Sequence, residues 1–211
     1  MIQEAYDKAM KKLGNFFGIE YVHDRPKVFL VANKKTIRDL REGRVASWVQ
    51  GWVDGKTSTV FILDRKRRLS KREIEGLYSG LLHELAHLFF LKVSGTNDDP
   101  LPVWLWEGTS LFLDGHTEQG KWNSVTPPKR FEDFLGYYSV HKLPGKEHEE
   151  GVYKESGFVV DLLATKFGKG KLLRLIRSLG RIRARSEFYR EFKKVYGFEL
   201  NYANFNRINS E

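Results

Sequence analysis

The stretch that most constrains the fold of this 211-residue chain is His83-Glu84-Leu85-Ala86-His87. On an α-helix, residues i and i+4 lie on the same face one turn apart, so two imidazoles at this spacing can reach one metal ion. Glu84 follows His83 at a different angle, and its carboxylate can therefore stand beside the ion and take a proton from water without being a ligand. The pattern predicts a helix that carries a hydrolytic zinc site.

The residues around this motif predict a buried helix. Ser70 to Glu73 form a capping-box pattern, which indicates a helix start. Apolar residues then recur at helical spacing over roughly 20 residues, namely Ile74, Leu77, Leu81, Leu85 and Leu88. Two histidines on a buried helix need a reason for their burial, and a shared metal ion supplies one. The alternative is a pair of core histidines with satisfied hydrogen bonds.

The best third ligand is Glu107, which lies in an apolar and aromatic segment. Pro102 opens this segment and Gly115 closes it, so we expect a short second helix whose aromatic side chains pack inward and carry Glu107 with them. The alternative is a solvated glutamate on an amphipathic helix, but Trp104 and Phe112 make the surroundings apolar. Two histidines, one glutamate and an open fourth position are typical of a catalytic zinc.

Residues 114 to 152 form the least regular part of the sequence, because glycine and proline recur throughout it. Such a loop can line or cover a binding cleft. It holds His116, His141 and His148, each of which is an alternative to Glu107 as a ligand. None of the three belongs to a motif, and a surface position is the default expectation for an isolated histidine.

Three motifs together resemble the gluzincin metallopeptidases, and most of all the small peptidase MA-like domains related to the thermolysin-type and large zinc aminopeptidase catalytic domains. They are His83-Glu84-x-x-His87, then Trp104-Leu105-Trp106-Glu107-Gly108, and finally Val152 to Leu163. The resemblance covers residues 83 to 163, and the helical tail is also similar. It implies a zincin-like fold and peptide or protein substrates.

The resemblance also implies a role for Tyr153. In the family, a tyrosine at the start of the helix that follows the zinc-ligand helices donates a hydrogen bond to the oxyanion of the tetrahedral intermediate. We therefore expect a helix over Lys154 to Phe167 with Tyr153 at its start. Tyr137 and Tyr138 are alternative donors, and for Tyr153 the alternative is a side chain that packs on the lower lobe. The chain departs from thermolysin-like enzymes at Leu111, where they carry an aspartate that orients a zinc histidine, and Ser110 or Asp114 is the alternative support.

Comparison with the motifs of two other peptidase groups narrows the class of peptidase. The chain has no match to the Gly-x-Met-Glu-Asn segment with which large aminopeptidases hold the substrate amine, so the choice between endopeptidase and aminopeptidase stays open. Phe90 and Gly95 do not supply the third histidine or the glycine spacing of metzincins. That family is therefore excluded.

The residues before the zinc helix predict a small, mostly antiparallel sheet. Lys27 to Ala32 form a short apolar strand, and Asn33 can cap a helix over Lys34 to Glu42. Val45 to Val53 and Thr57 to Leu63 then flank Asp54-Gly55, which is a strong signal for a two-residue hairpin.

The resemblance gives one of these strands a further role. In the family, the strand just before the zinc helix forms the sheet edge to which an extended peptide adds as another strand. Thr59 to Leu63 is the candidate for that edge. An ordinary core or edge strand is the alternative.

The tail predicts amphipathic helices with a basic face. Gly168 and Gly180 are expected to stop helices, and Ser186 to cap one. Between Lys166 and Tyr196, eleven Lys or Arg stand against two Glu, so the charge of this segment equals the formal net charge of +9 of the whole chain. This concentration indicates a nucleic-acid or other anionic partner, whereas the interspersed leucines favour a solvated face.

Composition narrows the remaining classes. A content of 41% hydrophobic residues allows a sizeable core, and the absence of cysteine excludes disulfides, a cysteine nucleophile and cysteine-ligated zinc. No stretch is long and apolar enough for a membrane span, and the first eight residues are too polar for a signal peptide. We therefore expect a soluble, cytoplasmic protein.

These observations predict a single α+β domain over residues 1–211, with an upper lobe of sheet and zinc helix over about 1–93 and a lower helical lobe over about 94–211. One Zn²⁺ per chain, held by His83, His87 and Glu107, would activate water for attack on a peptide carbonyl, with Glu84 as general base and Tyr153 as oxyanion donor. The alternatives are a zinc-binding protein with little or no proteolysis and a nucleic-acid-associated protein. The sequence leaves the oligomeric state open.

Overall fold

The computed structural model describes most of the chain, namely residues 2–33, 35–36, 39, 51–63, 71–96, 102–118, 126–136 and 146–211. The expected cap at Ser70, the strand residues before Gly51 and the candidate ligand His141 lie outside this description, as does the side chain of His148. The chain divides into two compact units, Met1–Phe89 and Phe90–Glu211. The sequence had predicted a boundary between the two lobes near residue 93.

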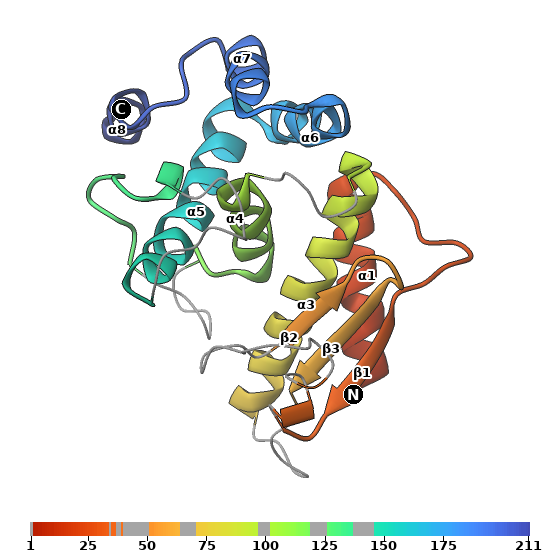
Figure 1. Ribbon diagram of the computed structural model, residues 1–211. Helices are drawn as coiled ribbons and strands as arrows, with labels where there is room; N and C mark the ends of the chain where they lie inside the picture. Colours follow the sequence, from red (N-terminus) through yellow and green to blue (C-terminus); the bar gives the residue numbers. More distant parts are fainter. Residues whose placement is uncertain are drawn as a thin grey trace. The chain divides into compact units, whose positions relative to one another are not determined.

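Figure 1 shows the elements along the chain. The first unit holds α1 (Ile2–Phe17), β1 (Lys27–Val31), β2 (Gly51–Asp54), β3 (Thr59–Leu63) and most of α3 (Lys71–Ser94), within which the division falls. The second holds α4 (Val103–Asp114), η1 (Phe134–Gly136), α5 (Lys146–Phe167), α6 (Lys169–Ser178), η3 (Leu179–Arg181), α7 (Arg185–Tyr196) and α8 (Tyr202–Ser210). The fold class is α+β, as the sequence predicted.

The sheet has three strands in the order β1-β3-β2 (Figure 1). β1 pairs with β3 in parallel, whereas β2 pairs with β3 antiparallel, so the sheet is mixed and not mostly antiparallel. β3 lies between the other two strands, and its Val60 and Ile62 are buried. The expectation that Thr59 to Leu63 forms a sheet edge was therefore wrong, because both sides of this strand are already paired.

The hairpin between β2 and β3 forms with a longer turn than the two residues expected. Asp54 pairs with Thr59, which leaves residues 55–58 in the turn. The Asp54 carboxylate organises it by accepting hydrogen bonds from the Lys56 backbone N–H at 3.0 Å and from the Thr57 hydroxyl at 2.7 Å. Ser58 adopts a positive φ of 49°, which closes the turn.

The two faces of the sheet differ in character. Phe61 on β3 stacks on Phe29 of β1 and on Trp52 of β2, at centroid distances of 5.6 and 5.0 Å. Side chains alternate along a strand, so Ile62 and the paired Gly51 belong to the opposite face. Gly51 contacts the Glu84 side chain there, which identifies this face as the one that packs on α3.

Contacts of Leu88 and Phe89 hold helix α3 in the first unit. Phe17 of α1 stacks on Phe89 at 5.8 Å, and the Tyr21 ring meets Phe89 edge-on at 4.9 Å. The Tyr21 hydroxyl donates a hydrogen bond to the Leu88 carbonyl at 3.1 Å, and burial raises the pKa of Tyr21 to about 12. These contacts hold the helical turn that includes His87.

In the second unit, α4 and α5 pack closely because glycine lies at their contact (Figure 1). A Cβ atom at Gly108 would overlap the backbone carbonyl of Ser156, and one at Gly157 would lie 3.1 Å from the Leu111 Cβ. Helix α5 begins at Lys146, so the prediction of a helix start at Tyr153 was wrong. Glu and Lys dominate the first turns, and these residues have good helix propensity.

A buried carboxylate joins α5 to the segment before η1. Glu155 accepts hydrogen bonds from the backbone N–H groups of Glu132, Asp133 and Phe134 at 2.9–3.1 Å. Burial raises the pKa of the Glu155 carboxyl, and these three hydrogen bonds oppose the shift. Phe134 and its neighbours then complete an aromatic core, which includes Trp104, Phe131, Phe188, Phe192 and Phe205.

The basic tail is helical, as predicted. Gly168 precedes α6 with a φ of 86°, and Gly180 lies in η3 at the end of that helix. The cap of α7 differs from the expected Ser186, because Ala184 is the N-cap and the helix begins two residues earlier than a Ser186 cap would place it. Glu187 accepts the backbone N–H of Arg183 at 2.7 Å and that of Ala184 at 3.3 Å, as the glutamate of a capping box does for the N–H groups at the helix start.

Across the described part of the chain, none of the helices combines the length and the apolar character that crossing a membrane requires.

Candidate metal centre

Two histidines of α3 face one another at the spacing that the motif predicts. The Nε2 atoms of His83 and His87 lie 3.2 Å apart, and the two rings are almost perpendicular at 89°. His87 is buried at 4% exposure, whereas His83 is half-buried. Each histidine therefore directs its Nε2 atom toward the Nε2 atom of the other.

The distance between these nitrogens fits a shared metal ion. In a tetrahedral site with metal–nitrogen bonds of about 2.0–2.1 Å, two nitrogen ligands lie about 3.3–3.4 Å apart. The observed separation of 3.2 Å is close to that value. The same distance also suits a hydrogen bond between two neutral imidazoles. The choice between a metal ion and a hydrogen bond therefore depends on the third group nearby.

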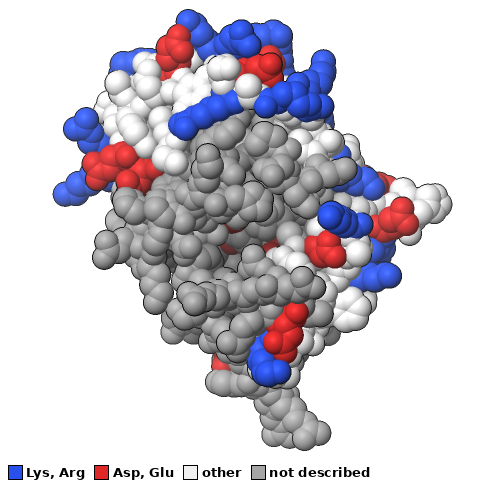
Figure 2. Space-filling view, in the orientation of Figure 1, with Lys and Arg blue, Asp and Glu red and all other residues white. Residues whose placement is uncertain are grey.

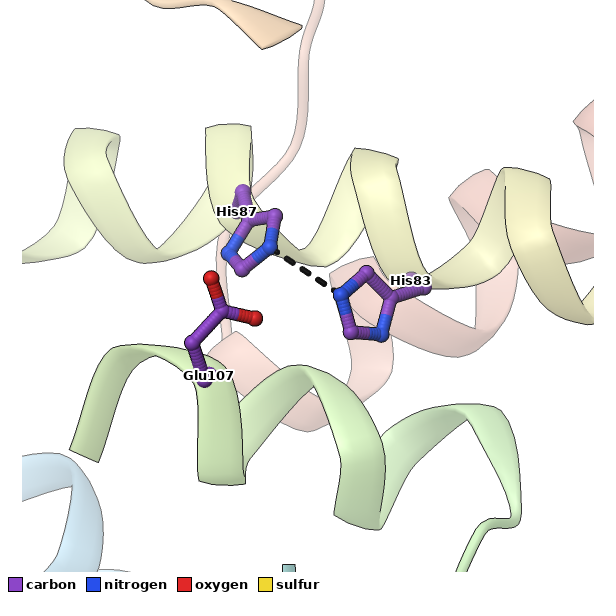
Figure 3. Close-up of side chains that lie close together, drawn as sticks. All are labelled: His83, His87 and Glu107. Atoms are coloured by element: carbon purple, nitrogen blue, oxygen red, sulfur yellow. Dashed lines mark hydrogen bonds between the residues drawn. The ribbon is translucent and has the colours of Figure 1, made fainter. Parts of the chain in front are cut away.

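That third group is the carboxylate of Glu107 on α4. The ligand atoms of His83, His87 and Glu107 all lie within 4.8 Å of one another (Figure 3). Glu107 is 8% exposed, as expected from its apolar surroundings. A carboxylate removed from water beside two imidazoles is favourable when a cation is shared among them. The donor set of two nitrogens and one oxygen therefore fits a metal ion such as zinc.

The local structure of α4 explains how Glu107 is held. Gly108 follows it directly and allows the helix backbone to approach α5. The Thr109 hydroxyl donates to the Leu105 carbonyl at 2.6 Å, which satisfies a buried polar group within the helix. Gly115 ends the helix with a φ of 92°, as predicted, and its N–H bonds to the Leu111 carbonyl.

Two residues considered as support for a zinc histidine also make local contacts. The Ser110 hydroxyl lies 3.4 Å from the Trp106 carbonyl within α4. The Asp114 carboxylate accepts the backbone N–H of His116 at 2.9 Å and so organises the turn after the helix. Both side chains thus help to shape α4, which carries Glu107.

Glu84, the expected general base, packs against the backbone of strand β2. A Cβ atom at Gly51 would lie 2.6 Å from Glu84 Oε1 and 2.7 Å from its Cγ. The absence of a side chain at Gly51 thus creates the space that the Glu84 side chain fills. Sequence analysis missed this residue, although a glycine inside a strand often marks the close approach of another group.

The remaining candidates are Tyr153 and His116. Tyr153 is half-buried on α5, about two turns after the helix begins. His116 lies just after α4, and within the described residues the metal-binding group contains only His83, His87 and Glu107. The structure therefore favours Glu107 over His116 as the third ligand.

No family model, curated protein or solved structure significantly matches this chain, so its chemistry must be inferred from the site itself.

Proposed function

We propose that this protein is a zinc-dependent peptidase of the gluzincin type with a zincin-like fold. The observation that carries the proposal is the meeting of His83, His87 and Glu107, with the two histidine nitrogens 3.2 Å apart. A helical H-E-x-x-H motif with a distant glutamate is typical of catalytic zinc sites that keep a fourth position open. When bound, zinc would supply Lewis acidity that lowers the pKa of water toward neutrality.

The chain supplies the groups that move the proton. Glu84 lies next to His83 on α3, and its side chain packs against the backbone at Gly51. Its carboxylate would accept a proton from the attacking water and return it to the leaving amine. Position matters here as much as basicity, because a general base must lie within hydrogen-bond reach of the proton that it takes.

The sheet offers a surface for an extended substrate. β2 forms an edge among the described strands, and its first residue contacts Glu84. We therefore assign to β2 the role that the sequence had suggested for β3. An extended peptide that adds to this edge would run next to the general base, and its main chain would be recognised by strand pairing.

Tyr153 is the candidate donor to the oxyanion, by resemblance to the family. Tyr153→Phe removes one hydroxyl and keeps the ring, so it should lower the catalytic rate roughly 10- to 1000-fold with little change in zinc content or thermal stability. Tyr189→Phe on α7 is a suitable control, because that exposed hydroxyl contacts Arg185 in the second unit. Full activity of Tyr153→Phe would remove Tyr153 from the mechanism.

The decisive test of the proposal compares two glutamates on the same helix. Glu84→Gln should retain zinc but lose peptide hydrolysis by about 100-fold or more, because the amide cannot accept the proton. The control is Glu75→Gln, which changes an exposed carboxylate of α3. Hydrolysis of a mixed-sequence peptide library, read by mass spectrometry, and elemental analysis of zinc give the two measurements.

Three outcomes separate the proposal from its alternatives. Loss of hydrolysis with retained zinc in Glu84→Gln supports the peptidase. Equal loss of zinc in Glu84→Gln and Glu107→Gln would show that the roles of base and ligand are misassigned. Zinc retention by a wild-type chain that cleaves no library peptide would favour a zinc-binding protein without proteolysis.

A further inference from the structure

A basic hollow lies in the second unit, on a part of the chain that the proposed chemistry does not use. It has a volume of about 690 Å³ and is formed by α6, η3 and α7. Figure 2 shows Lys and Arg side chains gathered at the top of this view, over these helices. Its cationic lining residues are Arg174, Arg177, Arg181, Arg190 and Lys194, and two glutamates accompany them.

The helical spacing explains why the charges converge. Arg174, Arg177 and Arg181 recur at intervals of three and four along α6 and η3, so they share one face. Arg190 and Lys194 do the same on α7. The opposite face of α6 is anchored in the core by Leu172, Leu175 and Ile176, all of them fully buried. The backbone positions of the cationic groups are therefore fixed by packing.

Each of the two carboxylates in the hollow already has a partner. Glu187 accepts two backbone N–H groups at the start of α7, and these hydrogen bonds lower the pKa of its carboxyl. Glu191 pairs with Lys194 at 3.6 Å. Arg174 and Arg181 make no ion pair with any carboxylate that the structure describes. Among the described residues, five cations and two carboxylates line the hollow, so it keeps an excess of positive charge.

The geometry points to an anion with several closely spaced phosphate groups as the ligand of this hollow, and we propose that the protein binds a compact oligophosphate here. Guanidinium groups present paired N–H donors that match phosphate oxygens, and four of the five cations are arginines. The volume falls within the range of small-ligand sites. Among the described residues of the lining, there is no aromatic ring on which a nucleobase would stack, which favours phosphate recognition over base recognition.

The test uses the full-length protein and inorganic tripolyphosphate, with calorimetry at low and high salt. We expect saturable binding of one tripolyphosphate per chain that weakens as salt is raised. Arg174→Gln combined with Arg181→Gln should weaken binding about ten-fold or more. The matched control combines Arg25→Gln with Arg207→Gln, which removes the same charge from exposed arginines outside the hollow and should change the affinity by less than about two-fold.

A charge change of opposite sign sharpens the test. Glu191→Gln removes a carboxylate from the hollow and releases Lys194, so it should tighten tripolyphosphate binding. Three results would overturn the proposal: no binding to the wild type, equal weakening in the hollow and control pairs, or tight binding of a short single-stranded oligonucleotide without binding of tripolyphosphate. The last result would assign the basic face to nucleic acid.

Discussion

In each of the two units, a glycine allows a close contact next to a carboxylate of the candidate site, but the two glycines meet different kinds of neighbour. In the first unit, Gly51 leaves room for the Glu84 side chain, which can rotate. In the second unit, Gly108 leaves room for the Ser156 backbone carbonyl, which cannot move without shifting α5. An added methyl group should therefore disturb chemistry in the first unit and folding in the second.

Gly108→Ala should have the largest effect. The new methyl group would overlap the Ser156 carbonyl, and separating α4 from α5 should lower the free energy of unfolding by about 3 kcal/mol. Urea denaturation followed by circular dichroism measures this change. Gly170→Ala on α6 is the control, because a methyl group there meets no atom within 4 Å and should be neutral or slightly stabilising. Equal stability of the two variants would refute the close contact.

Glu155→Gln tests the second unit at another point. In the wild type, three backbone N–H groups donate to the Glu155 carboxylate. The glutamine amide would place an NH2 group, which is also a donor, against some of them. The free energy of unfolding should therefore fall by about 2 kcal/mol. The same denaturation experiment measures it. Glu199→Gln provides a control, because among the described residues that exposed carboxylate pairs only with the Lys193 ammonium at the surface. A variant as stable as the wild type would show that these hydrogen bonds contribute little.

Gly51→Ala tests the contrast between the two glycines in the first unit. The methyl group should displace the Glu84 carboxylate and lower peptide hydrolysis about ten-fold or more, while zinc content stays unchanged and the free energy of unfolding changes by less than about 1 kcal/mol. Gly80→Ala on α3 is the matched control, since its methyl group would meet no atom within 4 Å. If Gly51→Ala unfolds as readily as Gly108→Ala, the two glycines do not differ in the way we describe.

Tyr21→Phe should have the smallest effect at neutral pH. It removes the hydrogen bond to the Leu88 carbonyl, worth about 1 kcal/mol. Because burial raises the pKa of Tyr21 from 10.0 to about 12, the folded state holds this proton more tightly than the unfolded chain. The wild type should therefore lose stability as the pH rises from 10 toward 12, and the variant should lose less. Parallel pH curves for both proteins would contradict this.

Much of the site could be predicted from the sequence because its spacing is local. His83 and His87 lie one helical turn apart, so the motif fixes their relation once the helix forms. Glu107 could be proposed because an acidic residue among tryptophans needs a partner, and the structure brings it to both histidines. The β2–β3 hairpin also followed from a local turn signal, though Asp54 organises a longer turn.

Two of the errors concern features that depend on distant residues, and one concerns a local feature. The central position of β3 follows from its parallel pairing with β1, which no local pattern encodes. The early start of α5 reflects helix-forming residues before Tyr153, whereas our expectation came from the family pattern. Gly51 was missed because its importance appears only when β2 lies against Glu84. Contacts between segments far apart in the chain thus account for the errors about β3 and Gly51, whereas the error about α5 is local.

The measurement that tests the central claim most directly is the zinc content of the purified protein and three variants. We predict one zinc per chain in the wild type and in His23→Ala, which changes an exposed histidine far along the chain from the motif. His87→Ala and Glu107→Gln should each lose most of the metal. If His87→Ala retains as much zinc as the wild type, the triad of His83, His87 and Glu107 does not hold the ion and the proposed chemistry fails.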